Sequence, residues 1–200
     1  MRPEESAYWE SMCQKTRPNG GYRDNIWKRQ VIVRKLLELD LIGKTILEIG
    51  IGMGVSFAAI NLAILGKFKY IGTDLSEGYC SFVKDHWNMD VRQTDVTCLP
   101  ARDNSIDIVV ALDSLEHIHP DDREAGNKEI NRVLSHPGQL VIHLGLEPSF
   151  HDNRFDHPYG SKEVLELLDT CGMRMVRHDV YTVDVGGKDR DHLWVIGERP

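Results

Sequence analysis

Residues 46–54, with the sequence ILEIGIGMG, join an apolar run to three glycines at alternate positions. The run at 46–49 is typical of a buried strand, and an apolar segment with helical spacing follows at 55–65. Because glycine accepts positive φ angles and lets a ligand approach the backbone, this spacing predicts a tight turn between a strand and a helix. In open α/β sheets, ligands bind at such turns, which lie at the carboxyl ends of parallel strands.

Segments with strand and helix patterns alternate along most of the chain. The expected strands are 45–49, 70–74, 91–95, 106–112 and 139–144, and the expected helices are 55–65, 76–87, 121–134 and 161–171. A turn is expected at 136–138, and the segments 173–183 and 192–197 predict a closing hairpin. This order predicts an α/β fold with a doubly wound, mostly parallel seven-stranded sheet that ends in an antiparallel C-terminal hairpin.

The N-terminal segment differs in composition from this alternating region. Residues 1–30 are polar, and a Pro-Asn-Gly-Gly run divides them, so we expect a helical extension or lid on a domain of residues 31–200. Aromatic residues outside the sheet can pack on the core or stack on a planar acceptor, and the sequence leaves both alternatives open. These residues are Trp9, Tyr22 and Trp27.

Bulk composition excludes several classes of function. The chain has 200 residues, 41% of them hydrophobic, and a formal net charge of −7, which disfavours a general nucleic-acid binder. Its four cysteines form no CxxC pair, so they are interpreted as reduced thiols and not as a disulfide frame or zinc site. Because no apolar run reaches the length of a membrane span and no signal peptide is recognised, a cytoplasmic location without membrane association is expected.

Acidic residues follow the glycine turn at the ends of the next two strands. Asp74 lies twenty residues after Gly54, where a carboxylate can accept hydrogen bonds from both ribose hydroxyls of a nucleoside. Asp95 and the backbone amide of Val96 provide an acceptor and a donor for an adenine edge. A carboxylate at Glu48, before the first glycine, would repel a pyrophosphate but suits an ammonium or sulfonium cation. These residues favour S-adenosylmethionine over NAD, whose fingerprint has a different glycine spacing.

The set of motifs resembles the class I S-adenosylmethionine-dependent methyltransferases, in the broad small-molecule (methyltransferase type 11-like) branch. The resemblance begins with ILEIGIGMG, continues through YIGTDLS, QTDVTCLP and SIDIVVALDSLEHI, and ends with RVLSHPGQLVI. It covers residues 43–144 and extends more weakly to 197. The chain departs from the family's L-x-P-G-G motif, where it has Ser135-His136-Pro137-Gly138-Gln139. This family has a Rossmann-like fold.

The resemblance also implies a role for each matching residue. The methionine and ribose portions of the cofactor would lie along Gly50, Gly52 and Gly54, with Glu48 beneath. Asp74 would hold the ribose and Leu75 would pack on the adenine. Asp95 and Val96 would bind the adenine edge, and the region from Ala111 to Asp113 would meet the methionine amino group. The product would be S-adenosylhomocysteine.

The implied reaction is an in-line displacement at the methyl carbon of a sulfonium, which mainly requires alignment of the two reacting centres and exclusion of water. A general base is needed only if the nucleophile arrives protonated, and the candidates are His117, His119 and His143. The first two histidines can alternatively cap or precede the following helix. Side chains of the long loop, with His143, could form a metal site, but their irregular spacing favours a polar substrate-facing loop and no metal. These loop residues are His151, Asp152, Asp156 and His157.

A small-molecule methyl acceptor is therefore the leading hypothesis, and nucleic acid is the less favoured acceptor. The sequence leaves open a nucleic-acid or protein acceptor, a non-catalytic S-adenosylmethionine-binding module, and the oligomeric state. The NPPY-like tetrad of amino-directed base methyltransferases does not occur after the strand at 106–112. A short NAD-binding domain is disfavoured by the glycine spacing and by the absence of a recognisable Tyr-x-x-x-Lys pair.

Overall fold

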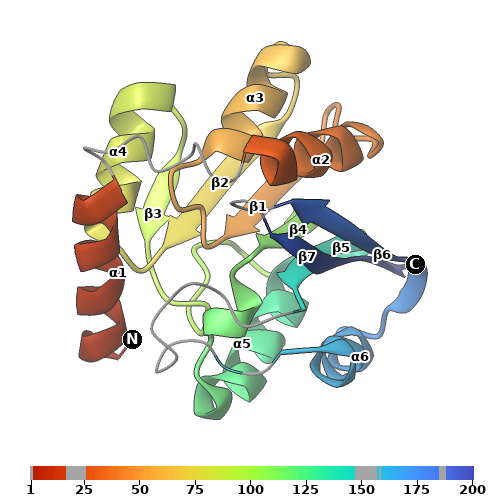
Figure 1. The fold of residues 1–200 in the computed structure, drawn as a ribbon. Coiled ribbons are helices and arrows are strands. Elements are labelled where there is room, and N and C mark those ends of the chain that lie inside the picture. The colour runs from red at the N-terminus through yellow and green to blue at the C-terminus, as the bar shows by residue number, and fades with distance from the viewer. Residues whose placement is uncertain (1, 17–25, 147–156, 158, 185–187) are drawn as a thin grey trace.

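A computed structural model describes residues 2–16, 26–146, 157, 159–184 and 188–200. They form one seven-stranded sheet of order β3-β2-β1-β4-β5-β7-β6, parallel except for the pairs made by β7 (Figure 1). The strands are β1 (Thr45–Ile49), β2 (Lys69–Asp74), β3 (Val91–Gln93), β4 (Ile106–Leu112), β5 (Leu134–Gly145), β6 (Arg174–Asp184) and β7 (Asp189–Arg199). The predicted doubly wound sheet and its antiparallel C-terminal hairpin are confirmed.

Helices cover both faces of the sheet (Figure 1). The helices are α1 (Pro3–Thr16), α2 (Ile26–Leu37), α3 (Val55–Ala63), α4 (Glu77–Trp87), α5 (Pro120–Val133) and α6 (Ser161–Thr170), with a short 3₁₀ helix, η2 (Leu115–His117). Alternate residues of β1 enter two separate cores: Leu47 packs on the side of α5 and α6, and Ile46 packs on the side of α2, α3 and α4. None of the described helices is both long and apolar enough to cross a membrane.

Two predicted boundaries are wrong. The third strand ends at Gln93, so Asp95 lies in the turn after the strand and not at its tip. The predicted turn at 136–138 lies inside β5, which already begins at Leu134. There the pairing with β4 passes from Leu134 directly to Gln139, so the Pro-Gly bend is an irregularity within a strand and not the start of one.

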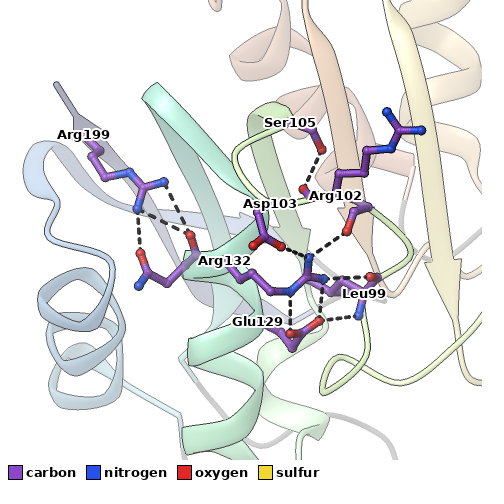
Figure 2. A network of polar contacts seen from close by, with 9 residues as sticks. Leu99, Arg102, Asp103, Ser105, Glu129, Arg132 and Arg199 are labelled. Atoms are coloured by element: carbon purple, nitrogen blue, oxygen red, sulfur yellow. Dashed lines mark hydrogen bonds and ion pairs between the residues drawn. The ribbon is translucent and has the colours of Figure 1, made fainter.

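Arg132 of α5 holds the connection between β3 and β4 in place (Figure 2). Its guanidinium forms ion pairs with Glu129 and Asp103, each at 2.7 Å. It also donates hydrogen bonds to the carbonyl oxygens of Leu99, at 3.1 Å, and Ala101, at 2.9 Å. Because the same connection carries Asp95 and Val96, α5 fixes the position of two predicted site residues.

The N-terminal region contains helix α1, which packs on the rest of the described chain. Helix α1 lies beside α4 and the end of β2 (Figure 1). Its Glu10 carboxylate accepts hydrogen bonds from the Ser76 hydroxyl and the Gly78 amide, both at 2.8 Å. At its start, Arg2 forms an ion pair with Asp122 of α5 at 2.7 Å. The helix therefore joins the α4 side of the molecule to α5. Tyr22 and the side chain of Trp27 lie outside the described residues.

Candidate functional site

A cavity of about 680 Å³ lies at the carboxyl ends of β1, β2 and β4. Its volume is within the range of small-molecule and cofactor sites. One half is lined by predicted cofactor residues, and the other half by ionisable side chains from α2, the β4–α5 connection and β7. The predicted residues that line it are Glu48, Gly50, Gly52, Asp74, Leu75, Asp95, Val96, Asp113, His117 and His119. Gly54, Ala111 and His143 do not line it.

The glycine turn has the backbone that its sequence predicts, with φ angles of +72°, +51° and +69° at the three glycines. A Cβ atom on Gly50 would lie 2.5 Å from the Ser114 Cβ, so close packing against the end of β4 excludes a side chain there. A Cβ on Gly52 would meet open space. Gly54 is the N-cap of α3 and packs against Val83 of α4, so it shapes the turn from behind.

Glu48 is almost fully buried on the α2 side of β1, with 3% of its surface exposed. The Tyr70 hydroxyl donates a hydrogen bond of 2.5 Å to its carboxylate, and Arg29 of α2 contributes a nearby positive charge. Burial nevertheless raises the pKa of Glu48 to about 7. When it is ionised, a buried carboxylate stabilises a cationic ligand atom more strongly than an exposed carboxylate does, because little water screens its charge.

Asp74 joins the glycine turn to the start of α4. One carboxylate oxygen accepts a hydrogen bond from the Gly52 amide, and the other accepts one from the Ser76 amide, both at 2.9 Å. Burial raises the pKa of Asp74 to about 6 in spite of these bonds. Each carboxylate oxygen has a further lone pair, so the group can still accept hydrogen bonds from a ligand. Leu75 follows on the cavity wall.

Asp95 and Val96 occupy the turn after β3. The Asp95 carboxylate accepts hydrogen bonds from the Thr97 amide at 2.9 Å and the Thr97 hydroxyl at 3.0 Å. Burial acts to raise the pKa of Asp95, but these bonds outweigh it and the pKa is lowered. Val96 packs against Gly126 of α5, where a Cβ would lie 3.1 Å from the valine side chain. Thr97 and α5 therefore hold the turn in place, and Asp95 lies on the cavity wall in its ionised form.

Asp113 follows β4 with a left-handed backbone, at a φ of +53°. Its carboxylate lies 2.9 Å from the Lys28 ammonium of α2 and 2.8 Å from Nδ1 of His143 on β5. Burial would raise the pKa of Asp113, but the adjacent His143 and Lys28 hold it well below its usual range. His143 itself is fully buried, so it contacts the cavity through Asp113 and not directly. Ala111 is buried within β4.

The short helix η2 and the start of α5 form the far wall. His117 ends η2, and its ring lies 4.7 Å from that of Trp9 on α1. His119 is the N-cap of α5, and its Nδ1 accepts a hydrogen bond from the Asp121 amide at 3.2 Å, as the capping alternative predicts. Both histidines also line the cavity. His119 therefore caps α5 and is also accessible to a ligand.

Several cavity residues were missed by the sequence analysis. Glu116, which directly precedes His117, is one of them, and burial raises its pKa to about 7. Lys28 and Arg29 lie on a helix whose apolar spacing gave no functional signal, and His192 comes from the far end of the chain. Glu116 is within the LEH motif that was quoted, so that motif could have identified it. The others meet the site only through the packing of α2 and β7.

The N-terminal helix closes one side of the cavity. Glu5 and Trp9 line it, and the Ser6 hydroxyl donates a hydrogen bond of 3.2 Å to the Leu75 carbonyl. The cavity wall thus includes a helix from the first 30 residues. Of the loop residues considered as metal ligands, His157 lines the cavity, whereas His151, Asp152 and Asp156 lie outside the described residues.

Comparison with known proteins agrees with this geometry. Residues 46–138 match the family model of a methyltransferase domain. A protein of Mycolicibacterium smegmatis named as a probable S-adenosylmethionine-dependent methyltransferase is 28% identical over 161 residues, which are 76% of this chain and 61% of that protein. The chain therefore spans about three fifths of that relative's length.

Solved structures show the same fold. Geranyl diphosphate C-methyltransferase from Streptomyces coelicolor, in complex with Mg²⁺, geranyl diphosphate and S-adenosyl-L-homocysteine, has a TM-score of 0.67 at 15% identity, over 86% of this chain and 80% of that one. A chain of the complex between the Haloferax volcanii Trm112 methyltransferase activator and a candidate methyltransferase has a TM-score of 0.74 at 16% identity, over 100% and 99%. These similarities confirm the predicted Rossmann-like methyltransferase fold.

Proposed function

We propose that the chain transfers a methyl group from S-adenosylmethionine to an O, N, S or C nucleophile of a small-molecule acceptor. Residues 46–138 match the family model of a methyltransferase domain, and a relative that is 28% identical is named as a probable S-adenosylmethionine-dependent methyltransferase. The observation that carries this proposal is the single cavity that Asp74, Asp95 and Glu48 share with a second wall of ionisable side chains. A cofactor and an acceptor can therefore meet in one enclosed space.

In this proposal, the cofactor lies across the bare backbone of Gly50 and Gly52. Asp74 accepts hydrogen bonds from the ribose hydroxyls, and Leu75 packs on the adenine. Asp95 and the Val96 amide bind the adenine edge. The buried charge of Glu48 and the backbone around Ala111 and Asp113 support the cationic methionine portion. Gly54 acts indirectly, by allowing α3 to begin close to α4.

The chemical step is a displacement in which a lone pair of the acceptor forms the new bond to the methyl carbon. The carbon–sulfur bond breaks, and its electron pair stays on sulfur to give neutral S-adenosylhomocysteine. If the acceptor atom carries a proton, His117 or His119 can accept it, since both line the cavity. His143 is fully buried, so we assign it the orientation of Asp113 and not direct contact with the acceptor.

A small acceptor is favoured by the way α1 limits the cavity. Glu5 and Trp9 of α1 line the cavity, with Trp9 beside His117, and the Arg2–Asp122 ion pair fixes the start of the helix on α5. The helix therefore limits the size of an acceptor that can enter. We assign α1 the role of a lid over the site, since it contacts both Leu75 and His117. The net charge of −7 also disfavours a nucleic-acid acceptor.

Calorimetric titration with S-adenosylhomocysteine tests the cofactor site. Asp74→Ala should weaken binding by at least about tenfold, a loss of ~1.4 kcal/mol, because the ribose loses its carboxylate acceptor. Asp85→Ala, on the exposed side of α4, is the matched control and should bind as the unmodified chain does. Unchanged affinity in a folded Asp74 variant would refute this assignment.

Mass spectrometry with an isotope-labelled methyl donor and a panel of small acceptors tests the activity. Transfer to a small molecule supports the proposal, and transfer only to RNA, DNA or protein would redirect it. Cofactor binding without any transfer would indicate a non-catalytic binding module. Because a similar structure was solved with the Trm112 activator, the panel should be repeated with an activator protein of that kind.

A further inference from the structure

Two buried histidines lie side by side behind Asp113. His143 of β5 pairs with Trp194 of β7, and Gly145 pairs with His192, so both histidines project from the same face of the sheet. This face is the one covered by α2. Their rings are nearly parallel, with planes 16° apart and centroids 5.0 Å apart.

The polar atoms of this group are buried with few partners. His143 is fully buried, and only 4% of the His192 surface is exposed. Among the described residues, no ring nitrogen of the two histidines makes a hydrogen bond of good geometry. Nδ1 of His143 lies 2.8 Å from the Asp113 carboxylate, and the backbone of Leu144 lies near the His192 ring. Buried polar atoms are normally paired, because leaving one unpaired costs about 1–3 kcal/mol. Such a concentration of buried, incompletely paired ring nitrogens beside a carboxylate therefore points to a ligand that this part of the chain would bind.

The geometry points to a cation as that ligand: we propose that Asp113, His143 and His192 bind a divalent transition-metal ion such as Zn²⁺, Co²⁺ or Fe²⁺. One oxygen of Asp113 and one ring nitrogen of each histidine all lie within 4.8 Å of one another. Ligand atoms bound at ~2.0–2.2 Å to one tetrahedral ion are roughly 3.5 Å apart, so a contraction of about one ångström completes the site. Two imidazoles and one carboxylate suit these ions better than Mg²⁺ or Ca²⁺, which prefer oxygen ligands.

Neighbouring side chains orient the metal ligands and affect the affinity for the ion. The Tyr181 ring stacks on His192 at a centroid distance of 5.8 Å, and Trp194 lies 6.3 Å from His143, so both imidazoles are held in orientation. Asp113 and His192 line the cavity, which gives an ion a route to the site and leaves its remaining coordination positions open to a small ligand. The Lys28 ammonium, 2.9 Å from the Asp113 carboxylate, opposes a cation and must move away from it.

This ion site shares Asp113 with the proposed cofactor site, but ion binding can be tested without methyl transfer. It differs from the loop site considered from the sequence, with which it shares only His143. The probe is Co²⁺ alone, followed by its visible absorption and by calorimetry on the purified full chain stripped with a chelator. We expect about one bound ion per chain with the strong absorption of a low-coordinate site, and displacement by Zn²⁺ but not by Mg²⁺.

Variants distinguish this site from adventitious binding. His192→Ala should weaken Co²⁺ binding by at least about tenfold, whereas His178→Ala, which removes an exposed histidine of β6, should not change it. Lys28→Met should tighten binding by about tenfold or more, because it removes the competing charge without removing a ligand. Circular dichroism confirms that each variant is folded. No stoichiometric Co²⁺ binding, equal affinity in the His192 and His178 variants, or weaker binding in Lys28→Met would each overturn the proposal.

Discussion

Glu48→Gln is expected to stabilise the ligand-free protein at alkaline pH. Glutamine has nearly the same shape and can still accept the Tyr70 hydrogen bond, so the substitution mainly removes the buried charge. Burial raises the pKa of Glu48 from 4.5 to about 7. Between these values the native protein keeps a proton that the unfolded chain has lost, so the free energy of unfolding falls as pH rises. At 1.36 kcal/mol per pH unit, this difference in pKa would lower the free energy of unfolding by ~3 kcal/mol. Water in the cavity screens part of the effect, so we expect a loss of about 2 kcal/mol.

The measurement is urea unfolding of both proteins, monitored by circular dichroism at pH 5 and pH 8. The stability difference between Glu48→Gln and the unmodified chain should be small at pH 5 and reach ~2 kcal/mol in favour of the variant at pH 8. Glu166→Gln on the exposed face of α6 is the control, and it should show no such pH dependence. A difference that is the same at both pH values would refute the buried-charge argument.

Other substitutions test the glycine turn, the connection between β3 and β4, and the proposed role of Asp74 in ribose binding. Gly50→Ala places a Cβ 2.5 Å from the Ser114 Cβ and should lower the unfolding free energy by about 2–4 kcal/mol. Gly52→Ala places its Cβ in open space, so it should lower the unfolding free energy by only ~1–2 kcal/mol. The Gly52 variant should nevertheless bind the cofactor more weakly in calorimetry. Arg132→Ala should lower stability in thermal unfolding by about 1–3 kcal/mol, because four residues lose its hydrogen bonds and ion pairs. Affinity for S-adenosylhomocysteine should fall up to tenfold per pH unit below the Asp74 pKa of about 6, since protonation removes the acceptor, and Asp74→Asn should abolish that dependence.

The half of the cavity that the predicted cofactor residues line could be anticipated from the sequence because those residues follow strands. The carboxyl ends of parallel strands meet at one edge, so an acid at the end of one strand lies near a turn at the end of the next. Glu48, Gly52 and Asp74 come together on this principle alone, and the amide of Gly52 does donate a hydrogen bond to Asp74. The local sequence places these residues at strand ends, and the sheet topology brings those strand ends together.

The opposite half could not be anticipated, because it depends on packing between distant segments. Lys28 meets Asp113 only when α2 packs on the sheet, and His192 meets His143 only through the register of β7 on β5. A shift of one residue in that register would turn His192 to the other face. The bend within β5 was missed because the local sequence was misleading. The Pro-Gly pair is typical of a turn, but pairing with β4 resumes at Gln139 and keeps the segment in the sheet.

The acids of the cavity wall carry an electrostatic cost, and their charges suit a cationic ligand. Glu48 is buried and Asp74 is half-buried on the cavity wall, and the negative charge of Asp74 further raises the pKa of Glu48. Arg29 and Tyr70 offset only part of this cost, because the pKa of Glu48 stays near 7. A ligand with a positive centre beside these carboxylates recovers the remaining energy, whereas an anionic pyrophosphate would add to it. The same charges that destabilise the free protein therefore select the class of ligand.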